Sequence, residues 1–173
     1  FFLGGHDRYA TYTSDNSLQC RNNVSIKQKY GNSFIGFEVY FENTNDGFVL
    51  GNELVGTSNY GRFSFHMGSG NLICFQHDSV SSQTATVISS AQTGRWYRVV
   101  MYDRQGAEGT MFFVDGVRTA IVPYGSGSSP SILYAGTIRF GRSPANLLTF
   151  RLSDFLWRVG VADSPASWDG TLN

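Results

Sequence analysis

The chain has 173 residues, a length typical of one domain, and we expect residues 1–173 to fold as a single unit. Its 13 basic and 13 acidic residues give a formal net charge of zero, which argues against nonspecific binding to nucleic acid or to an acidic membrane surface. No apolar run reaches the roughly 20 residues of a membrane-spanning helix, so we do not expect membrane insertion.

The first clear strand is "SFIGFEVYFE", residues 33–42, in which apolar and polar side chains alternate with the two-residue period of a strand. One face carries Phe37, Val39 and Phe41, and the other carries Glu38, Tyr40 and Glu42.

Residues 60–68, "YGRFSFHMG", alternate in the same way. The turn sequence "GSGN" leads directly into "NLICFQHD", 71–78, so the pattern predicts a hairpin over 60–78. Its first strand has Phe63, Phe65 and Met67 on one face and Arg62, Ser64 and His66 on the other.

Further strands are predicted at 84–90, 96–103, 109–114, 118–122, 136–142 and 150–160. No stretch has sustained helical periodicity, although 164–170 suits one short turn of helix and 124–131 reads as a surface loop. Roughly ten or more strands, together with 20 glycines, predict an all-β fold of two stacked antiparallel sheets or a barrel.

Residues 94–122 predict an antiparallel meander whose last turn is Asp115-Gly116. We interpret Asp115 as a turn residue and not as a catalyst. Two face assignments stay open for the strand at 96–103. Either Arg98 and Tyr102 point outward with Trp96, or Trp96 is a core anchor and Tyr97 and Met101 face outward.

This segment resembles the laminin-G-like and concanavalin A-like lectin/glucanase superfamily. The resemblance rests on a strand that opens with Trp96-Tyr97 and closes with Tyr102-Asp103, followed by Val114-Asp115-Gly116. It continues in "IRFGR", 138–142, and in "LSDFLWRVGVADSPASW", 152–168. What the resemblance implies is a two-sheet antiparallel β-sandwich, a jelly roll in which one sheet curves to leave a concave surface.

Catalytic patterns are missing from the sequence. Glucan-cleaving members of the superfamily carry carboxylates two residues apart, whereas Glu38 and Glu42 are four apart, or about 13 Å along a strand. Glycoside hydrolysis uses separations of roughly 5–9.5 Å. No Gly-x-Ser-x-Gly, His-Glu-x-x-His or cysteine-zinc spacing occurs, and His66 and His77, which could meet across the hairpin, are too few for a metal site.

The resemblance also implies one structural Ca²⁺ near the chain ends. Asp154 matches the ligand position in the last strand, and Asp7 could lie opposite it. The alternative is a surface or ion-paired Asp154, with Arg151 or Arg158 as its partner. The two cysteines, Cys20 and Cys74, also leave two readings open, which are a bridge between an early and a middle strand or two separate buried thiols.

Sugar recognition needs aromatic platforms beside hydrogen-bonding groups, and outward side chains and loops supply the candidates. The predicted ligand-binding residues are Glu38, Tyr40, Tyr60, Arg62, His66, Arg98, Tyr102, Tyr124 and Trp168.

The leading hypothesis is therefore a non-catalytic, carbohydrate-binding module of a larger secreted, surface or virion protein, with a glycan or a cell-surface or virion protein as its partner. A structural, assembly or receptor-binding domain of a phage tail fibre or capsid appendage is the first alternative, and it allows for an oligomer. A glycoside hydrolase with an unrecognised site is the second. Because the chain begins at Phe1, we expect a processed product or a domain cut from a longer protein.

Overall fold

The computed structural model describes the backbone of residues 10–12, 18–21, 33–53, 62–77, 82–104, 109–122, 137–142 and 148–159. Within these, it describes the side chains of residues 35–51, 63–76, 83–102, 109–122, 140–141 and 148–156. The described residues form twelve strands: β1 (Ala10–Tyr12), β2 (Leu18–Arg21), β3 (Ser33–Phe41), β4 (Gly47–Glu53), β5 (Arg62–Gly68), β6 (Asn71–His77), β7 (Ser82–Ile88), β8 (Trp96–Arg104), β9 (Gly109–Val114), β10 (Val117–Val122), β11 (Thr137–Arg142) and β12 (Phe150–Val159).

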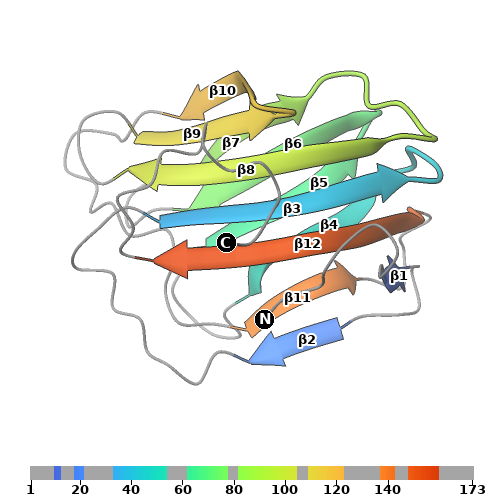
Figure 1. The fold of residues 1–173 in the computed structure, drawn as a ribbon, viewed down its shortest axis with the longest axis horizontal. Coiled ribbons are helices and arrows are strands. Elements are labelled where there is room, and N and C mark those ends of the chain that lie inside the picture. Colours follow the sequence, from blue (N-terminus) through green and yellow to red (C-terminus); the bar gives the residue numbers. More distant parts are fainter. Residues whose placement is uncertain are drawn as a thin grey trace.

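The strands form two antiparallel sheets that pack face to face (Figure 1). Sheet A has the order β1-β12-β3-β8-β9-β10, and sheet B has the order β2-β11-β4-β5-β6-β7. At one edge of the sandwich, β10 and β9 of sheet A lie against β7 of sheet B. The all-β, two-sheet antiparallel prediction is confirmed, and the barrel alternative is wrong. No helix among the described residues is long and apolar enough to cross a membrane.

One hydrophobic core fills the space between the sheets, and it is built from the inward residue of each alternating pair. Phenylalanine rings join the sheets edge to face. Phe65 of sheet B contacts Phe37 and Phe112 of sheet A, with 5.1 Å between the Phe37 and Phe65 centroids, and Phe140 of sheet B contacts Phe155 of sheet A. The inward residues predicted for β3 and β5 all belong to this core, namely Phe37, Val39, Phe41, Phe63, Phe65 and Met67.

Two tight turns confirm the hairpin predictions. Ser69 and Gly70 join β5 to β6 with φ angles of 50° and 75°, and Asp115 and Gly116 join β9 to β10 with φ angles of 52° and 80°. Two successive residues of positive φ match the right-handed twist of the flanking strands. Asp115 is therefore a turn residue, as the sequence predicts.

Strand β4 was missed by the alternation pattern, and a bulge explains why. The register of β4 against β5 shifts between Phe48 and Leu50, so that Val49 and Leu50 both enter the core. Phe48 pairs with His66 on the other side of sheet B. A bulge adds one residue to one strand, which breaks the two-residue period on which the prediction depends.

The cysteines are too far apart to bridge. Cys20 lies in β2 and Cys74 in β6, with β11, β4 and β5 between them. Four strand spacings amount to about 19 Å, whereas a disulfide needs Cα atoms within about 7 Å. Cys74 is a free, buried thiol, and burial raises its pKa well above the ordinary value.

Candidate functional site

The outer face of sheet A, which points away from the core, carries its side chains in rows set by the strand register. The first row runs across β12, β3 and β8 as Arg151, Tyr40 and Trp96. The second is Ser153, Glu38 and Arg98, and the third is Leu156, Gly36 and Val100. Side chains of β3, β8 and β12 that are distant in sequence therefore meet on one surface.

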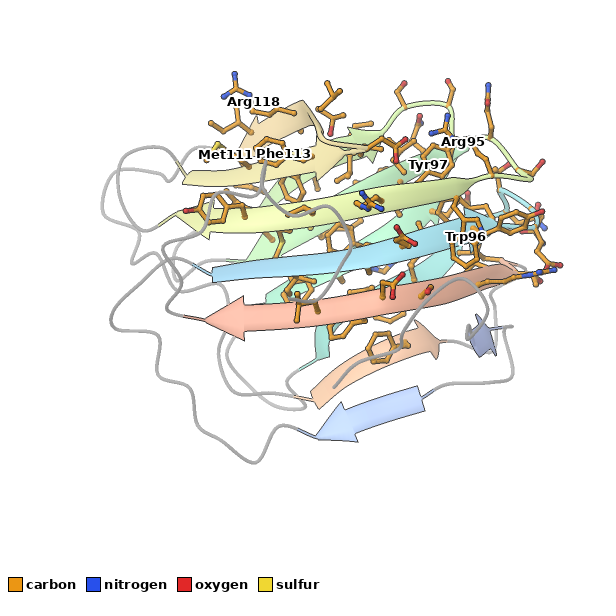
Figure 2. The ribbon with its side chains drawn as sticks, in the orientation of Figure 1. Arg95, Trp96, Tyr97, Met111, Phe113 and Arg118 are labelled. Atoms are coloured by element: carbon orange, nitrogen blue, oxygen red, sulfur yellow. The ribbon has the colours of Figure 1, made fainter. Side chains whose placement is uncertain are left out.

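The first row is an aromatic pair with a charged border. The rings of Tyr40 and Trp96 are both half-buried, and their centroids are 5.6 Å apart. The Arg151 guanidinium lies 5.1 Å from the Tyr40 ring and donates to the Glu42 carboxylate at 2.6 Å. Trp96 lies at the start of β8, at the opposite end of this face from Met111 and Phe113 (Figure 2).

The second row holds an ion pair between a buried carboxylate and a half-buried guanidinium group. The Arg98 Nε and one terminal guanidinium nitrogen each lie 3.0 Å from Oε1 of Glu38, whose side chain is only 5% exposed. The backbone N–H of Arg98 donates to the Asp115 carboxylate at 3.0 Å, and Asp115 also forms an ion pair with Arg95. The Asp115-Gly116 turn is thus attached to the first residues of β8.

Val100 and Leu156 of the third row belong to a small apolar cluster at the end of the face opposite Trp96. Val100, Tyr102 and Met111 are buried there, with Phe113 and Leu156 packed against them. Tyr102, a predicted ligand-binding residue, lies in this cluster and is nearly inaccessible. Its ring contributes apolar packing, so it offers little surface to a ligand.

The structure distinguishes the two predicted orientations of β8. Tyr97 and Met101 belong to the core, whereas Trp96, Arg98 and Tyr102 face outward. The reading that made Trp96 a core anchor is wrong. The signal that distinguishes the two readings is Arg98, because a charged side chain sharing the parity of Trp96 marks the face that meets water.

His66 lies on the outer face of sheet B, on the opposite side of the sandwich from Tyr40. Its ring makes edge-to-face contacts with Phe48 and Phe75, each at 5.1 Å between centroids, and Nε2 lies 2.9 Å from the Ser64 hydroxyl. His66 therefore cannot share a compact site with Glu38, Tyr40 and Arg98.

The proposed meeting of His66 and His77 is also wrong. The hairpin register pairs His66 with Ile73 and His77 with Arg62. The two-residue turn at Ser69-Gly70 fixes this register, because it makes Gly68 and Asn71 partners and every later pair follows from them.

We expect His66 to make folding sensitive to mild acid. Burial lowers the pKa of His66 below its ordinary value of about 6.5, so the unfolded chain binds a proton more readily than the folded one. The free energy of unfolding should therefore decrease as the pH falls below about 6.5, and the decrease should end below the folded pKa. Urea denaturation of wild type and His66→Phe at neutral and mildly acidic pH tests this. The wild type should lose more stability on acidification, and equal losses would contradict the prediction.

Asp154 lies at a bulge in β12, where the register against β3 shifts between Ser153 and Leu156. It is buried and has a φ of 49°. No three His, Cys, Asp or Glu side chains converge on a metal site within the described part of the chain. Ca²⁺ binds six to eight oxygen ligands. The calcium site predicted at Asp154 also includes Asp7, which lies outside the described residues. Arg151, one suggested partner of Asp154, pairs with Glu42.

Four other predicted residues lie outside the described side chains. Tyr60, Tyr124 and Trp168 lie outside the described residues, and Arg62 is described only as a backbone position of β5, paired with His77.

Glu38 and Glu42, the suggested hydrolytic pair, form ion pairs with two different arginines. Glu38 binds Arg98, Glu42 binds Arg151, and Tyr40 lies between them along β3. Retaining glycosidases hold two carboxyl groups across one bond at roughly 5 Å, and inverting ones at up to 9.5 Å. Two carboxylates on separate guanidinium partners, about 13 Å apart by strand rise, do not make that arrangement.

Comparisons with known proteins identify the fold and no family. No protein family matches this sequence, and neither does any curated protein. Among solved structures, it is similar to the binding domain of botulinum neurotoxin DC in complex with rat synaptotagmin II, with a TM-score of 0.67 and 15% identity over 91% of this chain and 40% of that one.

Two other neurotoxin structures are comparably similar. One is the serotype D ligand-binding domain in complex with N-acetylneuraminic acid, with a TM-score of 0.63 and 14% identity over 86% of this chain and 38% of that one. The other is botulinum neurotoxin type C, which depends on two ganglioside molecules to enter cells, with a TM-score of 0.65 and 13% identity over 91% and 40%. The chain spans about two fifths of the length of these structures. The TM-scores establish a shared fold, and at 13–15% identity the likeness is one of fold alone.

Proposed function

We propose that this chain is a non-catalytic binding module of lectin type, with a concanavalin A-like sandwich that holds a carbohydrate on the outer face of sheet A. The observation that carries the proposal is the row of Arg151, Tyr40 and Trp96, in which two half-buried aromatic rings adjoin a guanidinium group. The partner would be a glycan on a cell surface or on a surface protein, met outside the cell.

The chemistry of this row suits a sugar. A sugar ring has apolar C–H faces that pack on aromatic side chains, and hydroxyl groups at its rim that both donate and accept hydrogen bonds. Glu42 supplies acceptor oxygens, and Arg151 supplies N–H donors beside the Tyr40 ring. The neurotoxin neighbours support carbohydrate binding on this fold, because two of them are described with sialic acid or ganglioside ligands. At 13–14% identity only the fold is shared, so the kind of sugar that this chain prefers depends on its own side chains.

Removing either ring should abolish most of the binding. We expect Trp96→Ala and Tyr40→Ala each to weaken glycan binding at least about tenfold, as loss of a central aromatic contact does at binding sites. A glycan array probed with and without Ca²⁺ identifies the ligand, and titration of the variants with that ligand gives the change.

Phe75→Ala is the matched control, because Phe75 is a 36% exposed aromatic residue on the outer face of sheet B. It should bind as the wild type does. Equal loss in all three variants, or no binding to any carbohydrate in either condition, would reject the proposal.

A second candidate is an assembly or receptor-binding domain that contacts protein. It is favoured by strand β10 at the edge of sheet A, where Val117 and Ile121 are 66% and 48% exposed. A stable trimer in light scattering, together with no affinity for sugars, would support this candidate over the first.

A further inference from the structure

We infer that the carbohydrate bound on the outer face of sheet A is neutral, and that sialylated or sulfated forms of it bind more weakly. The inference rests on the proposed function and concerns the same surface. It follows because the charged groups around the Tyr40–Trp96 pair already form ion pairs with one another.

Each described guanidinium group near the aromatic pair has its own carboxylate. Arg151 pairs with Glu42, Arg98 with Glu38, and Arg95 with Asp115. The chain as a whole also has equal numbers of basic and acidic residues. The described border of the site therefore carries no excess of positive charge that would attract an anion.

The guanidinium groups are also held in place. Arg151 directs Nε and a terminal nitrogen at the same oxygen of Glu42, and it lies over the Tyr40 ring. The Arg95 guanidinium carbon lies 4.2 Å from the centroid of the Tyr97 ring, which gives this side chain a second contact beside Asp115. At Arg151, as at Arg98, the Nε edge of the guanidinium that would grip a carboxylate or sulfate is thus occupied within the protein.

To bind the Nε edge of Arg151 or Arg98, an acidic sugar would have to displace the carboxylate already paired with it. At Arg98 this would leave Glu38 buried without its charge partner and close to the incoming anion. At Arg151 it would bring the ligand's negative charge against Glu42. A neutral hydroxyl has neither penalty, because it can donate to a carboxylate oxygen and accept from an N–H of the same pair.

The test is a glycan array of matched oligosaccharides, each printed with and without a terminal sialic acid or sulfate. The neutral member of each bound pair should be preferred at least about tenfold, and its binding should change less than about twofold between roughly 0.05 M and 0.5 M NaCl. Equal or stronger binding of the acidic members would overturn the inference and leave the proposed function standing. No binding to any glycan would overturn both.

A charge-removing variant gives an independent readout. Glu42→Gln releases Arg151 from its carboxylate, so the ratio of acidic to neutral binding should rise at least about fivefold. The matched control is Asp46→Asn, which removes the same charge from an exposed residue that accepts from the Ser69 N–H at the β5–β6 turn. That variant should leave the ratio unchanged. An unchanged ratio in Glu42→Gln, or an equal rise in both variants, would contradict the inference.

Discussion

Phe65→Ala should lower the free energy of unfolding by about 4 kcal/mol, the loss expected when a buried phenylalanine leaves a cavity in a close-packed core. Phe65 is fully buried on β5 and contacts Phe37 and Phe112, which both belong to sheet A. The substitution therefore removes one of the rings that join the two sheets. Urea denaturation followed by tryptophan fluorescence gives the change, with circular dichroism as a check that the variant folds.

The control for Phe65 is its outward-facing counterpart on the next strand. Phe75→Ala removes the same ring from β6, where it is partly exposed on the other side of sheet B. Its loss should be under about 1 kcal/mol. Similar losses for the two variants would mean that Phe65 is not inside a sandwich core.

Gly51→Ala should be the next most damaging change, with a loss of about 3 kcal/mol, at the upper end for an overpacked site. A Cβ at Gly51 would lie 2.6 Å from the carbonyl oxygen of Phe63 and 2.8 Å from Cα of Ser64. These are backbone atoms of the neighbouring strand, so relief requires β4 and β5 to move apart. Thermal and urea denaturation both measure the effect.

Gly68→Ala is the matched control in β5. A Cβ there would meet only Cδ1 of Ile73, at an ordinary contact distance of 3.5 Å. Its stability should stay within about 0.5 kcal/mol of the wild type. A Gly51→Ala protein as stable as Gly68→Ala would rule out the close approach of β4 and β5.

Strands whose two faces differ in polarity could be predicted from the sequence, and strands that break the alternation could not. Strand β3 has a core face and an outer face along its whole length, so the two-residue period identifies it. Strand β4 places two successive residues in the core through a bulge, and β1 and β2 have only three and four residues. In neither case does the alternation of apolar and polar residues run long enough to be recognised.

The candidate site was harder to predict because it depends on which strands become neighbours. In the sequence, Tyr40 and His66 are equivalent, since each is an outward residue of an alternating strand. The pairing of Tyr40 with Trp96 joins residues 56 positions apart, and it assigns them to sheet A, whereas His66 pairs within sheet B. Such long-range pairing is set by the packing of the whole core and has no local signal.

Trp96 and Arg151 illustrate the same limit. The sequence leaves Trp96 open between a core anchor and an outward residue, and it suggests Arg151 only as an ion-pair partner. Both border Tyr40 on the outer face. Their role follows from the registers of β8 and β12 against β3. The parity of Trp96 with Arg98 was the one signal in the sequence that pointed outward.

The most direct test of carbohydrate binding on sheet A is a titration of isotope-labelled protein with the best-bound neutral oligosaccharide, followed by two-dimensional NMR. Chemical-shift changes should be concentrated at the Trp96 indole N–H and at the backbone amides around Tyr40 and Arg151. Changes centred on His66 and Phe75, or no changes at saturating sugar, would contradict the account.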